Sequence, residues 1–486
     1  MPTAATRARL LPGLVLLGIL AAPPAGAEGL RDALATAYRT NPTLEAARAG
    51  QRATDETVAI ERAAGLPAAS VQVTHTEFVK QNAANFVAPD RALQGDATLT
   101  VPVYSGGAVR NAVKAAKTRV GAGQADLRAT ESAIFSQVVA AYMDVILNEA
   151  VVGLNRNNVQ VLDVNLRATG DRYEIGDLTR TDVAQSQARL AIARSDTRSA
   201  EASLSNARER YIQLVGNPPG ALDPPPPLPG LPATAEEATA IALEHNPDIL
   251  AARERSKAAD YDIDVAGAGR LPRLEVFSGA TRLDYLDSLG GSNIPGLVTA
   301  QTATTAQVGL RARIPVFQGG RPAAQRRPAQ ARAGAALETE IATERDVIAQ
   351  VRSAFASFRA ANEIIASNQS AVEAATLSLE GVRAENSVGN RTVLDILDAE
   401  QELLQAQVRL VTARRNAYVA GFTLLAAMGR AEAQDLGLDG GALYDPDVNY
   451  QRVRGKWLDW ENDPAPVARA TRTVDTAVQD GSIRDK

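Results

Sequence analysis

Two series of small and apolar residues, each repeating every seven positions, constrain this fold more than any other feature. In the C-terminal half they are Ile396, Leu403, Leu410, Ala417, Leu424 and, three positions on, Ala399, Ala406, Ala413, Ala420, Ala427. The N-terminal half has matching series: Val183, Leu190, Thr197, Leu204, Tyr211 and Ser186, Ala193, Ala200, Ala207, Leu214. Apolar residues at the a and d positions of heptads predict long helices that pack in a left-handed coiled coil.

The two halves of the chain are related by an internal repeat. The matching segments run in the same order in both: Asn41-Pro42 with Asn246-Pro247, Val101–Gly107 with Ile314–Gly320, Gly176 with Gly389, and Asp182 with Asp395. Self-similarity of this kind predicts two copies of one structural unit. The sequence is divided accordingly into five parts: a signal peptide (1–27), a first repeat (28–216), a proline-rich linker (217–232), a second repeat (233–430) and a partly disordered tail (431–486).

Each repeat is expected to contain helices and two strands, so the fold class is mainly α with a small β part. The strands are expected at about 70–79, 97–105, 273–281 and 303–317, where apolar and polar residues alternate. Four strands cannot close a membrane barrel, because the smallest such barrels use about eight. Either several chains share one barrel, or the strands form a soluble cap on a coiled-coil rod.

Composition excludes several classes of function. The chain has no cysteine and only two histidines, which leaves no disulfide framework and no thiol metal site. A net charge of −5 argues against nucleic acid as a partner. No nucleophile–base constellation and no phosphate-binding loop is visible, so we expect no enzyme activity, no metal and no cofactor.

An acidic pair follows the second expected hairpin turn, at Gly389. Asp395 and Asp398 are three residues apart and therefore share one face of a helix. Acidic residues are common in the first turn of a helix because they complement its dipole. The first repeat differs here, because it has Asp182 but places Gln185 opposite Asp398. One repeat alone supplies the full pair, which is consistent with a functional role.

Taken together, these motifs resemble the TolC family. They are the signal peptide, the Asn-Pro openings, the P-V-[YF]-x-G-G strand exits, the paired G-x-x-T-x-x-D turns at Gly176 and Gly389, and D-I-L-D-A. Residues 444–450 further resemble the branch of the family that serves type I secretion. The family implies a homotrimer in which long helices form an α-barrel in the periplasm. This joins a 12-stranded barrel in outer-membrane lipid, with four strands from each chain.

The resemblance also implies roles for individual residues. Asp395 and Asp398 match the family's periplasmic gate, and Arg391 matches an arginine that links to Asp182 and Thr181. A tyrosine that assists this link in the family is replaced here by Asn386. Arg311 and Arg313 either line the barrel lumen or pair with carboxylates on neighbouring strands.

Two classes of function follow from these expectations. One is an outer-membrane exit duct that works with a periplasmic adaptor and an inner-membrane pump, either an ABC transporter or a proton-driven one. The other is a soluble periplasmic coiled-coil scaffold or adaptor. The sequence leaves open whether protein or small molecules would pass through the duct.

Overall fold

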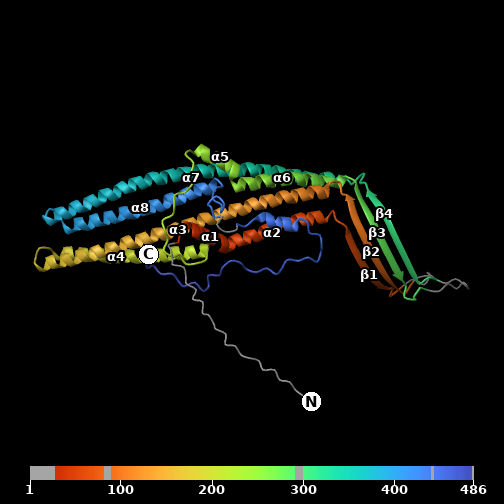
Figure 1. Ribbon diagram of the computed structural model, residues 1–486, viewed down its shortest axis with the longest axis horizontal. Coiled ribbons are helices and arrows are strands. Elements are labelled where there is room, and N and C mark those ends of the chain that lie inside the picture. Colours follow the sequence, from red (N-terminus) through yellow and green to blue (C-terminus); the bar gives the residue numbers. More distant parts are fainter. Residues whose placement is uncertain (1–27, 81–88, 290–298, 439–442, 484–486) are drawn as a thin grey trace, which may run out of the picture.

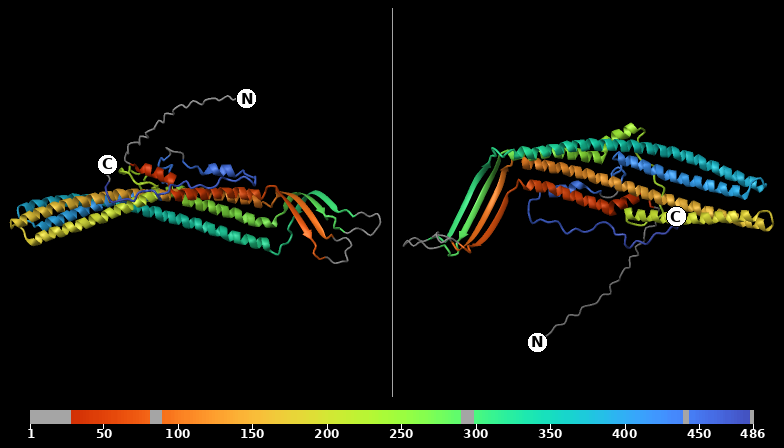
Figure 2. Two further views of the ribbon diagram at one scale, coloured as in Figure 1. Left: turned by 90° about the horizontal axis from the view of Figure 1, so that it is seen from below. Right: turned by 180° about the vertical axis from the view of Figure 1, so that it is seen from behind.

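The computed structural model describes residues 28–80, 89–289, 299–438 and 443–483. The expected signal peptide, 1–27, lies outside these ranges. A long bundle of helices carries one sheet at its end, and the sheet projects beyond the helices (Figures 1 and 2). The mainly α class with a small β part is confirmed.

The helices occur in the same order in both halves of the chain. The first half contains α1 (Leu30–Thr40), α2 (Pro42–Ala63), α3 (Ala108–Glu174) and α4 (Arg180–Val215). The second half contains α5 (Ala235–His245), α6 (Pro247–Gly267), the 3-10 turn η1 (Ala268–Arg270), α7 (Arg321–Ser387) and α8 (Val393–Ala427); α9 (Pro446–Val453) follows. Helices α3 and α7 each have 67 residues, which corresponds to roughly 100 Å at the usual rise per residue.

The four strands form one antiparallel sheet in the order β1-β2-β3-β4. Their bounds differ from the expected ones: β1 is Ala68–Glu77, β2 is Arg91–Tyr104, β3 is Arg273–Asp284 and β4 is Thr302–Arg313. Strand β4 ends before Pro315, because proline has no N–H to donate to the ladder. Strand β2 begins earlier than expected because Arg91 and Ala92 pair with β1, and from Leu93 on the strand pairs with both β1 and β3.

The heptad seams lie between the long helices. Nine seam positions of α4 are buried: Ser186 and the eight from Leu190 to Leu214. In α8 the pattern shifts: Leu397 and Leu404 are buried, while Ile396 and Leu403 are only half-buried. One part of α3 is long enough and apolar enough to cross a membrane, judged by length and composition alone. Its buried residues, such as Phe135 and Val138, pack in the core shared with α4 and α8.

Two asparagines close the ends of the repeats in the same way. Asn41 Oδ1 accepts from the backbone N–H of Thr43 at 2.9 Å and caps α2. Its Nδ2 donates to Leu214 O, at the end of α4, at 2.9 Å. Asn246 repeats both bonds, to Asp248 N–H and to Ala427 O, each at 2.9 Å. Each asparagine therefore caps one helix and holds the end of another, as the internal repeat predicts.

The described part of the tail contacts the helical bundle near both of its ends. Asn449 of α9 donates to Asp55 of α2 at 2.7 Å. Near the C-terminus, the fully buried Arg208 of α4 donates to the backbone oxygens of Asp480 and Ser482 at 2.9 and 2.8 Å. The partial disorder expected for the tail stays a prediction, and Gln479, Asp480 and Ser482 make these contacts with α4. Near the C-terminus the polar composition gives no sign of the contact, because Arg208 binds backbone oxygens of the tail.

One half-buried carboxyl, that of Glu131, holds the start of the tail. Glu131 of α3 accepts the backbone N–H of Ala433 at 2.6 Å. Burial raises the pKa of Glu131 to about 7, and the nearby charge of Glu432 adds to this, while Arg48 and Arg128 oppose it. The folded chain therefore binds a proton that the unfolded chain releases between about pH 5 and 7.

We expect Glu131→Gln to remove one pH dependence of stability. In the wild type, the free energy of unfolding should fall by about 2–3 kcal/mol at most as the pH rises through this range. Chemical denaturation of the helices, followed by circular dichroism at several pH values, measures this. Glu236→Gln, at an exposed position, is the control. An unchanged pH profile in Glu131→Gln would contradict the assignment.

Candidate gate and membrane surface

Two helical hairpins form the end of the molecule opposite the sheet (Figure 1). Helices α3 and α4 meet at Gly176, and α7 and α8 meet at Gly389. Both glycines have a left-handed backbone, with φ of +82° and +83°, and a Cβ at either would meet no atom within 4 Å. The backbone conformation, rather than lack of space, therefore requires glycine at these turns.

Each returning helix begins with the same capping box. Asp182 accepts from the backbone N–H and the hydroxyl of Thr179, at 2.9 and 2.7 Å. Asp395 accepts from Thr392 in the same way, at 2.8 and 2.7 Å. The threonine hydroxyls, followed by the backbone N–H groups, lower the pKa of both carboxyls. Both aspartates are thus held ionised at the tip of the molecule, and each stabilises the start of its helix.

Asp398 pairs with a residue that the sequence analysis did not identify. Its carboxylate accepts from the guanidinium of Arg189, and this ion pair joins α8 to α4. The Asp398 side chain is 58% exposed and the Arg189 side chain 35%. The two residues lie in different repeats, far apart in sequence, so no local spacing indicates the pair.

Arg391 does not reach Asp182 within one chain. Its Nε donates to Glu385 at 2.6 Å, and its Nη1 lies 3.9 Å from Asp395. Asn386, the residue in place of the family's tyrosine, donates to the Arg391 backbone oxygen at 2.7 Å. The expected link of Arg391 to Asp182 and Thr181 is therefore not formed in the protomer, where Arg391 instead braces its own turn.

One face of the sheet is apolar and exposed. The register aligns mostly alanine, valine and leucine side chains across the strands. The rows include Ala69, Leu99, Ser278, Val308 and Val71, Ala97, Ala280, Ala306. Val71 and Val308 are each 78% exposed. Neither face of the sheet is covered by a helix (Figure 2). Exposed apolar surface of this extent marks a contact with lipid or protein.

The opposite face of the sheet is polar. Ser70 bonds to Thr98 at 2.8 Å, and Thr281 donates to Asp96 at 2.8 Å. Arg311 donates to Glu275 at 2.7 Å and lies over the Phe277 ring, 4.6 Å from its centroid. Of the two alternatives for Arg311, pairing with a carboxylate on a neighbouring strand is the one seen in the protomer.

Arg313 differs from Arg311, because it lies opposite Arg273 in the register. No ion pair of Arg313 occurs among the described residues. Within the same described ranges, no group of three or more acidic or histidine side chains could hold a metal ion.

The sequence matches the model of the family described as outer membrane efflux protein, over residues 33–217 and 239–430. The chain belongs to this family. The two matched ranges coincide with the two structural repeats. They leave out residues 1–32, 218–238 and 431–486. The family places the chain in the outer membrane with a periplasmic extension, as expected, and it disfavours the soluble scaffold.

Individual relatives agree with this membership. Outer membrane efflux protein BepC of Brucella suis is 35% identical over 92% of this chain and 94% of its own length. Outer membrane protein TolC of Escherichia coli is 27% identical over 86% of each chain. The crystal structure of VceC from Vibrio cholerae superposes with a TM-score of 0.70 at 22% identity, over 82% of this chain and 96% of that one. The resemblance to the TolC family is thereby confirmed.

The capping boxes generate a prediction about the hairpins. Thr392→Val or Thr179→Val removes a cap that is worth about 1 kcal/mol, so amide exchange in the first turn of α8 or α4 should be about fivefold faster. Hydrogen–deuterium exchange with mass spectrometry measures this. Thr412→Val, inside α8, where the hydroxyl bonds to the Val408 backbone oxygen, is the matched control. Equal exchange in all three variants would argue against the caps.

Proposed function

We propose that three copies of this chain form one passive exit duct through the outer membrane and the periplasm. The observation that carries this is the sheet, with its exposed apolar face and its two unpaired edges, β1 and β4. Unpaired backbone groups are not tolerated in lipid, so the edges need partners. Pairing β1 of one copy with β4 of the next closes a barrel of 12 strands. The paired helices then continue the barrel as a tunnel.

The polar face of the sheet lines the lumen in this arrangement. Arg311 and Arg313 lie on that face, and Glu275 neutralises the first of them. Arg313 therefore contributes the stronger positive charge to the inner wall. The apolar face contacts lipid, which explains why its valines are exposed in the isolated protomer.

The narrow end of the duct is closed by the hairpins. Asp395 and Asp398 of three copies form two acidic rings, which bind cations and resist passage. Opening moves α8 away from α4, which requires the Arg189–Asp398 ion pair to break. In the trimer, Arg391 exchanges Glu385 for Asp182 and Thr181 of a neighbouring copy and thereby links adjacent hairpins.

A duct of this kind carries out no reaction and needs partners that supply energy and select the cargo. A periplasmic adaptor joins it to an inner-membrane pump, either an ABC transporter or a proton-driven one. Residues 444–450 resemble the type I secretion branch and favour the first. Protein and small-molecule cargo are separated by deleting the gene and assaying both secreted proteins and sensitivity to dyes and drugs.

The shared barrel can be tested by cross-linking, because the chain contains no cysteine. Ser70→Cys in β1 combined with Gln307→Cys in β4 lies in one row of the polar face. Within one chain these strands are about 14 Å apart, too far for a disulfide. We expect oxidation of membranes to give covalent dimers and trimers, in this pair or with the β4 cysteine moved by two residues to Thr305 or Gly309.

Single-cysteine variants control for random collisions, since they stop at dimers. Monomers alone from every two-cysteine variant, in protein that is correctly inserted in the membrane, would contradict the shared barrel.

The acidic rings can be tested in planar bilayers. Asp395→Ala with Asp398→Ala should weaken block by divalent or trivalent cations roughly tenfold or more, because six carboxylates are lost from one constriction. Single-channel conductance at increasing cation concentration measures this. Asp196→Ala with Glu373→Ala, which removes equal charge from exposed sites on α4 and α7, is the control. Block that matches the wild type in the gate variant would refute the assignment.

A further inference from the structure

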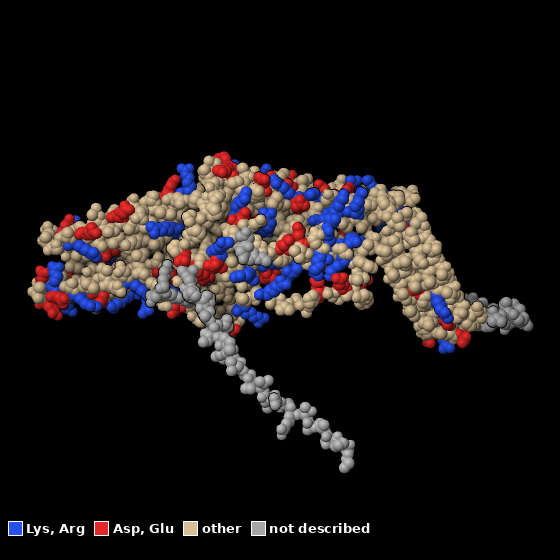
Figure 3. All heavy atoms as spheres, in the orientation of Figure 1, with Lys and Arg blue, Asp and Glu red and all other residues tan. Residues whose placement is uncertain are grey.

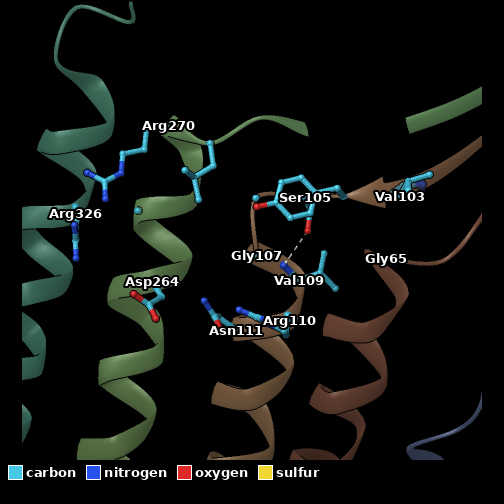
Figure 4. Close-up of a pocket in the computed structure, with 15 residues that line it drawn as sticks. Gly65, Val103, Ser105, Gly107, Val109, Arg110, Asn111, Asp264, Arg270 and Arg326 are labelled. Atoms are coloured by element: carbon cyan, nitrogen blue, oxygen red, sulfur yellow. Dashed lines mark hydrogen bonds between the residues drawn. The ribbon is translucent and has the colours of Figure 1, made fainter. Parts of the chain in front are cut away.

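A pocket with three arginines lies where the helices meet the sheet (Figure 4). Its volume is about 660 Å³. Arg110 comes from α3, Arg270 from the turn η1 before β3, and Arg326 from α7. Asp264 of α6 is the one carboxylate in its lining. The pocket therefore carries a net positive charge.

These arginines have no ionic partner in the part of the chain that the structure describes. Arg326 Nε is buried and makes no hydrogen bond. Farther from the sheet, arginines of α3 and α6 form ion pairs across these two helices: Arg119 pairs with Asp262, and Arg255 with Asp126. Arginines without an ion pair also occur singly on the helix surfaces, but here three of them line one cavity with a single carboxylate, which indicates an anion from outside the chain.

More unpaired arginines surround the pocket. Arg273, Arg313 and Arg327 also make no ion pair among the described residues, and Figure 3 shows basic side chains gathered where the bundle meets the sheet. The pocket is lined by the last residues of β2 and by residues just before β3. Because the sheet crosses the membrane in the proposed function, this level is the lipid–water boundary facing the periplasm.

A tryptophan segment lies at the same level. The chain has two tryptophans, and Trp457 and Trp460 are 71% and 94% exposed. Arg62, in the last turn of α2 before β1, donates to the Arg454 backbone oxygen at 3.0 Å and fixes the position of this segment. Tryptophan is enriched at membrane–water interfaces.

We propose that the arginine pocket binds the phosphate of an anionic phospholipid in the periplasmic leaflet, and that the tryptophan segment enters the same headgroup layer. This rests on the proposed function, because that function places the sheet in the membrane. Arg110, Arg270 and Arg326 neutralise the lipid phosphate. Asn111, which also lines the pocket, supplies an uncharged donor. The negative charge of Asp264 lowers the affinity for anions. It also reduces the positive charge of the pocket, so that a single phosphate is preferred.

Lipid retention tests the pocket. The protein is reconstituted in vesicles of equal parts phosphatidylethanolamine and phosphatidylglycerol, extracted again, and its bound lipid measured by mass spectrometry. The wild type should be enriched in phosphatidylglycerol. Arg110→Gln with Arg270→Gln and Arg326→Gln should reduce this enrichment by roughly a hundredfold, at about fivefold for each arginine. Asp264→Asn should increase it.

A matched variant, Arg345→Gln with Arg352→Gln and Arg409→Gln, removes the same charge from exposed positions along the helices and should keep the enrichment. Equal enrichment in both triple variants would overturn the proposal. So would displacement of phosphatidylglycerol by an equal concentration of inorganic phosphate, which would indicate a free-anion site. Thermal unfolding of each variant shows that it is folded.

The duct can be assessed separately, because conductance in pure phosphatidylethanolamine membranes should be unchanged by the pocket variant. A wild type that forms no channel there defeats the proposed function, whereas intact channels without lipid preference defeat the pocket alone. Emission from the two tryptophans should be quenched by lipids labelled near the headgroup and little by lipids labelled at the chain end. Emission that no labelled lipid quenches would overturn the placement of the tryptophan segment.

Discussion

The hydrogen-bonding groups at the two edges of the sheet set the requirement on which the architecture depends. Strands β1 and β4 each present, on their outer side, backbone N–H and C=O groups that no other strand in the described part of the chain meets. In water such an edge costs little, but in hydrocarbon each unpaired group costs several kcal/mol. The edge strands therefore find hydrogen-bond partners only in an assembly. The exposed valines on one face likewise need apolar surroundings that the protomer alone does not supply.

The internal repeat explains both the symmetry and the asymmetry of the helical end. The capping boxes of Asp182 and Asp395 have nearly the same geometry, because each hairpin needs the same start to its returning helix. The ion pair of Arg189 with Asp398 exists in one direction only, since the corresponding residues of the other repeat are Glu402 and Gln185. Two hairpins built on one plan thus present different surfaces at the same end of the molecule.

The sequence predicted the long helices, the repeat, the caps and the two-faced strands, because each depends on local spacing. It placed the end of β4 too late and missed the first residues of β2, where polar residues in a doubly paired strand give no alternation. It also missed Arg189, Glu131 and the contacts of the tail. These depend on which segments lie side by side in space, and a charged residue on a helix surface carries no sign of its partner.

The equal lengths of α3 and α7 have a consequence for how such a chain can change. Both helices have 67 residues, and the returning helices α4 and α8 have 36 and 35. Both hairpin tips consequently end level with each other, at one distance from the membrane. An insertion or deletion in one half alone would leave the mouth of the tube uneven. Evolution can alter the length of the tube only by matched changes of whole heptads in both halves. Each half of the sequence therefore specifies the same distance across the periplasm.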